Sequence, residues 1–153
     1  MLAAIRPDSW NFPLLLHVLG AMLLIGALIL AAVILVGAWR SGSPALVRSG
    51  ARVLVLGVFP AFLLMRISAE WVASKEGVND IDPPPSWVDI GYITGDLGAL
   101  LIIVSMICAG LAVRRMRRGE TGPSVSARIA TGLLSFLVLA YVVAIWAMTT
   151  KPS

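Results

Sequence analysis

The stretch Phe12–Trp39, FPLLLHVLGAMLLIGALILAAVILVGAW, decides the fold class of this chain. It contains no Asp, Glu, Lys or Arg, and it is longer than the roughly 20 helical residues that cross a hydrocarbon core. Because lipid offers the backbone no hydrogen-bond partners, such a segment must form a helix. It is also too long for the apolar part of a cleaved signal peptide, so we expect a retained membrane span.

Three further apolar runs follow along the chain of 153 residues. Together with the first, they predict spans over residues 12–39, 53–73, 92–113 and 129–148. None of the runs alternates between polar and apolar residues, as the strands of a membrane barrel do. We therefore predict an all-α polytopic membrane protein, a single transmembrane domain over residues 1–153 that forms a four-helix bundle.

The overall composition excludes several classes of protein. Hydrophobic residues make up 59% of the chain and charged residues 13%, against roughly 45–50% and about 25% in soluble domains. This excludes a soluble globular enzyme and a disordered chain. The single cysteine and the single histidine exclude an internal disulfide and a metal site built from several Cys or His ligands. We see no nucleophile–base arrangement and no phosphate loop, so we expect no hydrolase or transferase.

Basic residues divide unequally between the predicted connections. The connections on one side carry eight arginines, with Glu120 as their only acidic residue: Arg40, Arg48, Arg52, Arg114, Arg115, Arg117, Arg118 and Arg128. The other side carries Arg6, Lys75 and Lys151. By the positive-inside rule, the arginine-rich side is cytoplasmic and both termini are extracytoplasmic.

We accordingly expect a multi-pass protein of a bacterial inner (cytoplasmic) membrane, with the lipid bilayer as its surroundings. The same arginines account for the net charge of +4, so the charge does not indicate nucleic acid as a partner. A homo-oligomer and a larger membrane complex both remain open.

Ionisable side chains inside membrane spans are costly, so they mark sites that matter for structure or function. Four fall within the predicted spans, His17, Arg66, Glu70 and Asp96, and Tyr141 lies at a depth similar to that of Arg66. The alternating direction of the spans places all five in one leaflet, which the predicted orientation makes the outer one. Arg66 and Glu70 are four residues apart, so they can pair on one helix face.

This polar layer has three interpretations. Arg66, Glu70 and Asp96, with a tyrosine, form a polar network that clamps the four helices together, or they form the polar end of a ligand pocket inside the membrane. In the third, the side chains extend to the lipid headgroups without partners. A small channel or transporter would use the same charges as a pathway, but the chain lacks the inverted repeats typical of transporters.

His17 also has several interpretations. It is a structural side chain with a hydrogen-bond partner, or an axial haem ligand, as neutral imidazole is in many helical bundles. In the haem case Met65, Met148 or Met22 can supply a second ligand, and Arg66 can pair with a propionate. Proton transfer and hydrogen bonding to a quinone are the remaining roles.

Two packing features accompany these residues. Pro60 has no N–H, so it removes the backbone bond to the carbonyl of Leu56 and is expected to bend the second span. Gly91, Gly95 and Ala99 recur every four residues on the third span. This spacing permits close helix approach, either within the chain or between copies of it.

Two motifs resemble those of small bacterial membrane families. Leu16–Gly20, LHVLG, is similar to the opening of several four-helix families. Trp146–Pro152, WAMTTKP, resembles the M-x-x-K-P close of the uncharacterised domain-of-unknown-function 2269 group. Copper-resistance D and HemJ-type proteins are more distantly similar. The resemblance covers most of the chain and implies a four-helix membrane fold. The HemJ-type likeness implies haem binding at His17. The copper-resistance likeness implies metal handling, but the chain lacks a matching cluster of His, Met or Cys ligands.

The sequence thus predicts a small integral membrane protein that is more a redox-linked binding protein than an enzyme. Its expected site is a haem b or quinone site near His17 in the outer leaflet, with Arg66, Met65, Met148 and Tyr141 around it. The alternative is a structural or accessory subunit of a larger membrane complex without a cofactor. A small channel or transporter ranks third.

Overall fold

The computed structural model describes residues 8–120 and 124–150. Its long elements are α1 (Asn11–Ser41), α2 (Pro44–Val53), the π-helical turn η2 (Leu54–Val58), α3 (Phe59–Glu76), α4 (Ser86–Arg117) and α5 (Val125–Thr150). Two short 3₁₀ turns, η1 (Asp8–Trp10) and η3 (Val78–Asp80), complete the described fold. Since α2, η2 and α3 are continuous, the described residues contain four helices long and apolar enough to cross a membrane. The predicted all-α four-helix fold is confirmed.

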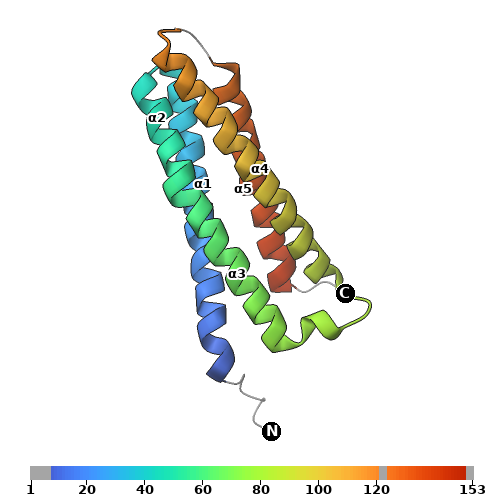
Figure 1. The fold of residues 1–153 in the computed structure, drawn as a ribbon. Coiled ribbons are helices and arrows are strands. Elements are labelled where there is room, and N and C mark those ends of the chain that lie inside the picture. The colour runs from blue at the N-terminus through green and yellow to red at the C-terminus, as the bar shows by residue number, and fades with distance from the viewer. Residues whose placement is uncertain (1–7, 121–123, 151–153) are drawn as a thin grey trace.

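The helices form two packed pairs that diverge toward one end of the bundle. α1 packs along α2 and α3, α4 packs along α5, and α1 also contacts α5 (Figure 1). α3 and α4 make few contacts with each other. At the end where they separate, α1 begins, α3 ends, α4 begins and α5 ends (Figure 1).

Leucines on the inner face of α1 form the centre of the core. Leu24, Leu28 and Leu35 are 0% exposed, and their spacing of four and seven residues places them on one stripe of the helix. The opposite face of α1 carries large apolar side chains that are exposed, such as Met22 (69% exposed) and Val33 (63% exposed). An apolar exterior of this extent is typical of helices that contact lipid.

The helices extend beyond the predicted spans at every end. The largest difference concerns Arg48 and Arg52, which we expected in a connection but which lie on α2. α2 begins at Pro44, two residues after the left-handed Gly42 that ends α1. Apolar patterning misses such a segment because α2 buries only one face, at Val47 and Gly50, and exposes its arginines.

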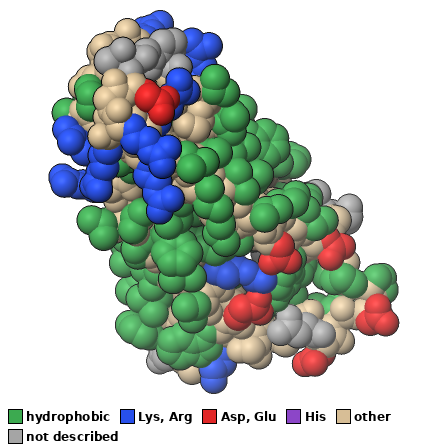
Figure 2. Space-filling view, turned by 45° about the horizontal axis from the view of Figure 1, so that its top comes forward, with side chains coloured by type: hydrophobic (Ala, Val, Ile, Leu, Met, Phe, Trp, Pro, Cys, Tyr) green, Lys and Arg blue, Asp and Glu red, His purple; other side chains and the backbone are tan. Residues whose placement is uncertain are grey.

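Charged side chains separate along the bundle. The arginines cluster at the end formed by the α1–α2 and α4–α5 connections, whereas acidic side chains predominate toward the other half (Figure 2). In the arginine-rich half, Arg115 pairs with Glu120 at 2.5 Å, and the guanidinium of Arg128 lies 4.8 Å from the ring centroid of Trp39. Arg6 and Lys151, which enter the orientation argument, lie outside the described residues.

Pro60 is accommodated by a local change in helix type. The turn before it, η2, is a π-helix in which the N–H of Phe59 donates to the carbonyl of Leu54, five residues earlier. Pro60 follows at the second position of α3. The predicted disturbance of the second span thus takes the form of a widened turn within a continuous helix.

Candidate functional site

A glycine brings α1 against the backbone of α3. A Cβ atom on Gly20 would lie 2.6 Å from the backbone nitrogen of Met65, which is closer than any side chain tolerates. His17 lies one turn earlier on the same face of α1, and its Nδ1 is 3.1 Å from the carbonyl oxygen of Met65. The spacing of His17 and Gly20 in the LHVLG motif therefore has a structural reason. Gly20 lets α3 come close to α1, and this brings the carbonyl of Met65 within hydrogen-bond distance of His17.

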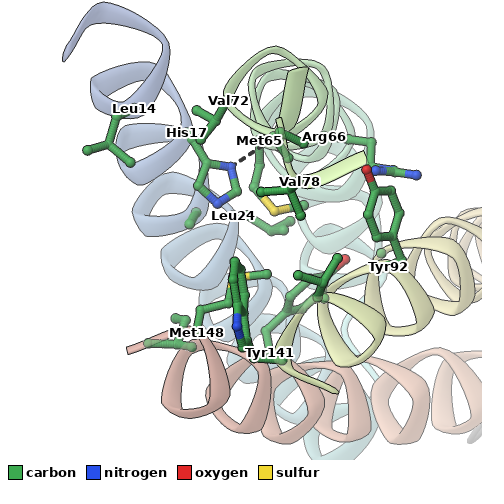
Figure 3. Close-up of a pocket in the computed structure, with 18 of the residues that line it drawn as sticks. Leu14, His17, Leu24, Met65, Arg66, Val72, Val78, Tyr92, Tyr141 and Met148 are labelled. Carbon is green, nitrogen blue, oxygen red and sulfur yellow. Dashed lines mark hydrogen bonds between the residues drawn. The ribbon is translucent and has the colours of Figure 1, made fainter. Parts of the chain in front are cut away.

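This hydrogen bond fixes the tautomer of His17. A carbonyl oxygen can only accept, so Nδ1 must donate its proton to Met65. In a neutral imidazole the other nitrogen, Nε2, then carries a lone pair and acts as an acceptor or as a metal ligand. Figure 3 shows that this nitrogen points away from Met65, into the space above Tyr141 and Met148.

The space is a cavity of about 330 Å³ between the diverging helix pairs, called the His17 cavity below. Its volume lies within the range of sites for small molecules. The walls are mostly apolar: Leu14, His17, Ala21, Leu24, Ile25, Met65, Arg66, Ala69, Val72, Ala73, Glu76, Val78, Trp87, Val88, Gly91, Tyr92, Gly95, Tyr141, Ile145 and Met148. A second cavity beside η2 is lined by apolar residues alone, so it offers no polar group to orient a ligand.

A polar network, called the Arg66 network below, joins α3 to α4 beside the cavity. Arg66 donates through Nη1 to Oε1 of Glu70 and through Nη2 to Oδ1 of Asp96, the latter at 3.2 Å. The hydroxyl of Tyr92 donates to Oε2 of Glu70 at 3.1 Å, and the guanidinium carbon of Arg66 lies 5.0 Å from the Tyr92 ring centroid. The network therefore connects two helices, not four as the clamp interpretation predicted.

Exposure differs strongly within the Arg66 network. The side chains of Arg66, Glu70 and Asp96 are 27%, 46% and 72% exposed. Arg66 thus lies between the cavity and the outer surface, while Asp96 faces outward from the bundle.

Tyr141 lines the His17 cavity but does not join the Arg66 network. The residue is 6% exposed, and its buried hydroxyl has no hydrogen-bond partner among residues 8–120 and 124–150. The hydroxyl lies against Gly98, where a Cβ atom would overlap it. Tyr92, which we had treated only as the start of a span, supplies the tyrosine of the network instead.

Of the three methionines considered as haem ligands, two line the His17 cavity and one does not. Met65 and Met148 line the His17 cavity from α3 and α5, and Met148 lies across the cavity from His17 (Figure 3). Met22 is 69% exposed on the outer face of α1, so it cannot reach the same space.

The glycines of α4 serve packing within the chain. A Cβ on Gly91 would overlap Met148, and one on Gly95 would touch Arg66 at 3.6 Å. This face of α4 is therefore occupied by other helices of the same molecule. At these two positions, the space left by the missing side chains is filled by side chains of the same chain.

Two residues of the site were not predicted as such. Tyr92 lies one turn before Asp96 on α4, and this i, i+4 spacing was the signal available for it. Trp87 lies near the start of α4, where a tryptophan is typical of an anchor at the lipid headgroups, but here it lines the His17 cavity. No sequence pattern distinguishes these two positions of a tryptophan near a helix start.

Comparison with models of protein families, with curated proteins and with solved structures found no match. Among the described residues, no group of three or more His, Cys, Asp or Glu side chains is placed to hold a metal ion. Of the ending that resembles M-x-x-K-P, Lys151 and Pro152 lie outside the described residues.

Proposed function

We propose that the protein binds a flat lipophilic redox molecule, a haem b or a quinone, in the His17 cavity. One observation carries the proposal: the Nδ1 hydrogen bond to Met65 leaves Nε2 of His17 as an acceptor facing a mostly apolar cavity. A carbonyl partner on the second ring nitrogen is the usual arrangement for a histidine that ligates a metal, and it equally orients an acceptor for a quinone ring.

The donor set fits a haem in part. His17 would be the axial ligand and Met148 the candidate second ligand, and the bound iron would supply one-electron chemistry. The acidic side chains of a haem are matched less well. Among the described lining residues the one Lys or Arg side chain is Arg66, and it already pairs with two carboxylates.

The charge distribution supports a proposed orientation. We place the arginine-rich end at the cytoplasmic face of a bacterial inner membrane, which puts the His17 cavity in the outer leaflet and both termini outside. A ligand dissolved in that leaflet would then reach the cavity without crossing the membrane.

The test is the chemical analysis of protein purified in mild detergent. A Soret band identifies haem, and solvent extraction followed by chromatography identifies a quinone. We expect one of these molecules to copurify with the native chain and to be lost in His17→Ala. Met22→Leu is the matched control on the same helix, because Met22 faces outward and should leave binding unchanged. If neither molecule copurifies, and added haem and quinone also fail to bind in a His17-dependent way, the proposal is wrong.

A second candidate function is favoured by one observation. Asp96 is 72% exposed on a membrane-spanning helix, and a carboxylate facing lipid is costly. An accessory subunit would cover it with a basic or hydrogen-bonding side chain of a partner helix. Cross-linking in native membranes tests this role: a defined partner should be captured by the native chain and lost with Asp96→Leu.

A further inference from the structure

The Arg66 network, which lies beside the His17 cavity, has a net negative formal charge. Arg66 contributes one positive charge, and Glu70 and Asp96, both paired with it, contribute two negative charges. Since charges in a medium of low polarity interact over long distances, this arrangement disfavours ligands that carry carboxylates or phosphates. It favours an uncharged ring over the two propionates of a haem.

The hydrogen-bonding character of Nε2 of His17 is a second property that selects among ligands. In the neutral imidazole, Nε2 of His17 accepts hydrogen bonds and donates none, because the one ring proton lies on Nδ1 and is donated to the carbonyl of Met65. A ligand group placed against Nε2 must therefore be a donor. The oxygens of a quinone are acceptors, whereas those of the reduced hydroquinone carry O–H donors.

The walls of the cavity suit an aromatic ring. Trp87 and Tyr141 line it from α4 and α5, and the remaining surface is largely aliphatic. Aromatic rings prefer offset or edge-to-face contact with one another. An apolar site with aromatic walls and an oriented acceptor at Nε2 of His17 matches an uncharged hydroquinone with an alkyl tail.

Resting on the function proposed above, we infer that the His17 cavity selects the reduced, uncharged hydroquinone form of a membrane quinone. One hydroquinone O–H donates to Nε2 of His17. The oxidised form binds more weakly, because its carbonyl oxygen would face the lone pair of Nε2 without a proton between them.

The experiment uses the full chain in phosphatidylcholine nanodiscs and an alkylated benzoquinone as the probe. Binding is followed by quenching of tryptophan fluorescence, because Trp87 lines the cavity. The probe is titrated once oxidised and once reduced under anaerobic conditions. We expect the reduced form to bind about tenfold more tightly, the size of one satisfied hydrogen bond. His17→Gln, whose amide both donates and accepts, should remove most of that preference.

The outcomes separate this inference from the proposed function. Equal binding of the two probe forms, or tighter binding of the oxidised form, overturns the inference. The proposed function survives that result if binding still depends on His17. His17-dependent binding of haem, without hydroquinone binding, likewise overturns only the inference. If neither haem nor either probe form binds, both proposals fail.

Discussion

Replacing Gly20 with alanine should separate α1 from α3 at the level of His17. The new Cβ atom would lie 2.6 Å from the backbone nitrogen and 2.8 Å from the Cα of Met65. These neighbours are backbone atoms of a continuous helix, so no side-chain rotation can relieve the overlap. The helices themselves must move apart.

The size of the movement and its energy follow from these distances. Restoring ordinary contact at about 3.4 Å requires a separation of about 0.8 Å. Overpacking of this kind costs about 1–3 kcal/mol, offset in part by the roughly 0.5–1 kcal/mol that alanine contributes to a helix over glycine. We expect a net loss of about 1–2 kcal/mol in the free energy of unfolding. The hydrogen bond from Nδ1 of His17, now 3.1 Å, would lengthen to about 3.9 Å and be lost.

The assay is unfolding of the purified protein by increasing mole fraction of SDS in mixed micelles, followed by circular dichroism. Gly26→Ala is the matched control, because Gly26 lies on the same helix and a Cβ there meets nothing within 4 Å. The control should be as stable as the native chain or slightly more stable. If Gly20→Ala and Gly26→Ala unfold at the same SDS fraction, α1 and α3 do not meet in the way the argument requires.

Four further outcomes are expected. Tyr141→Phe should leave stability unchanged or raise it by about 1 kcal/mol in the same SDS assay, because the lost hydroxyl is buried and has no partner within the described part of the chain. A clear loss of stability would indicate a hydrogen bond that the geometry lacks. Arg66→Met should lower stability by about 1–2 kcal/mol, less than for a fully buried pair because its partners are partly exposed. Asp96→Asn should cost less than about 1 kcal/mol, and the reverse order of these two losses would contradict the burial argument. Finally, with the native cysteine removed, Ser49→Cys should react with a membrane-impermeant thiol reagent only in inverted vesicles and Asp82→Cys only in intact spheroplasts. The opposite pattern would reverse the proposed orientation.

The membrane helices were predictable because lipid imposes one rule on every span. An apolar run of about 20 residues must be helical, whatever packs beside it. The ends were less predictable, because a helix continues past the last apolar residue wherever one of its faces is still buried. α2 is the clearest case, since Val47 is 1% exposed while Arg48 next to it is exposed.

The membrane leaflet of the site residues was predictable from the sequence, but the contacts between these residues were not. Counting along the spans predicted that His17, Arg66 and Tyr141 share one leaflet, and all three line one cavity in the structure. The partner of His17 is a backbone carbonyl, which has no sequence signature. Gly20, one turn away, was the available indication that a neighbouring helix approaches there. The pairing of Arg66 with Glu70 followed from their spacing of four residues. The contact of Arg66 with Tyr92 depends on how α4 packs beside α3, which the spacing does not give.

The His17 cavity depends on glycines in two opposite ways. On α1, Gly20 removes a side chain so that the backbone of α3 comes close enough to orient the imidazole. On α4, glycines at successive turns make room for long side chains that also line the cavity: Met148 at Gly91, Arg66 at Gly95 and Tyr141 at Gly98. Because these side chains lie against α4, they leave space in front of His17 that they would otherwise fill. A methyl group on that face of α4 would therefore change the volume of the cavity. A methyl group at Gly20 would instead change the direction in which Nε2 of His17 points.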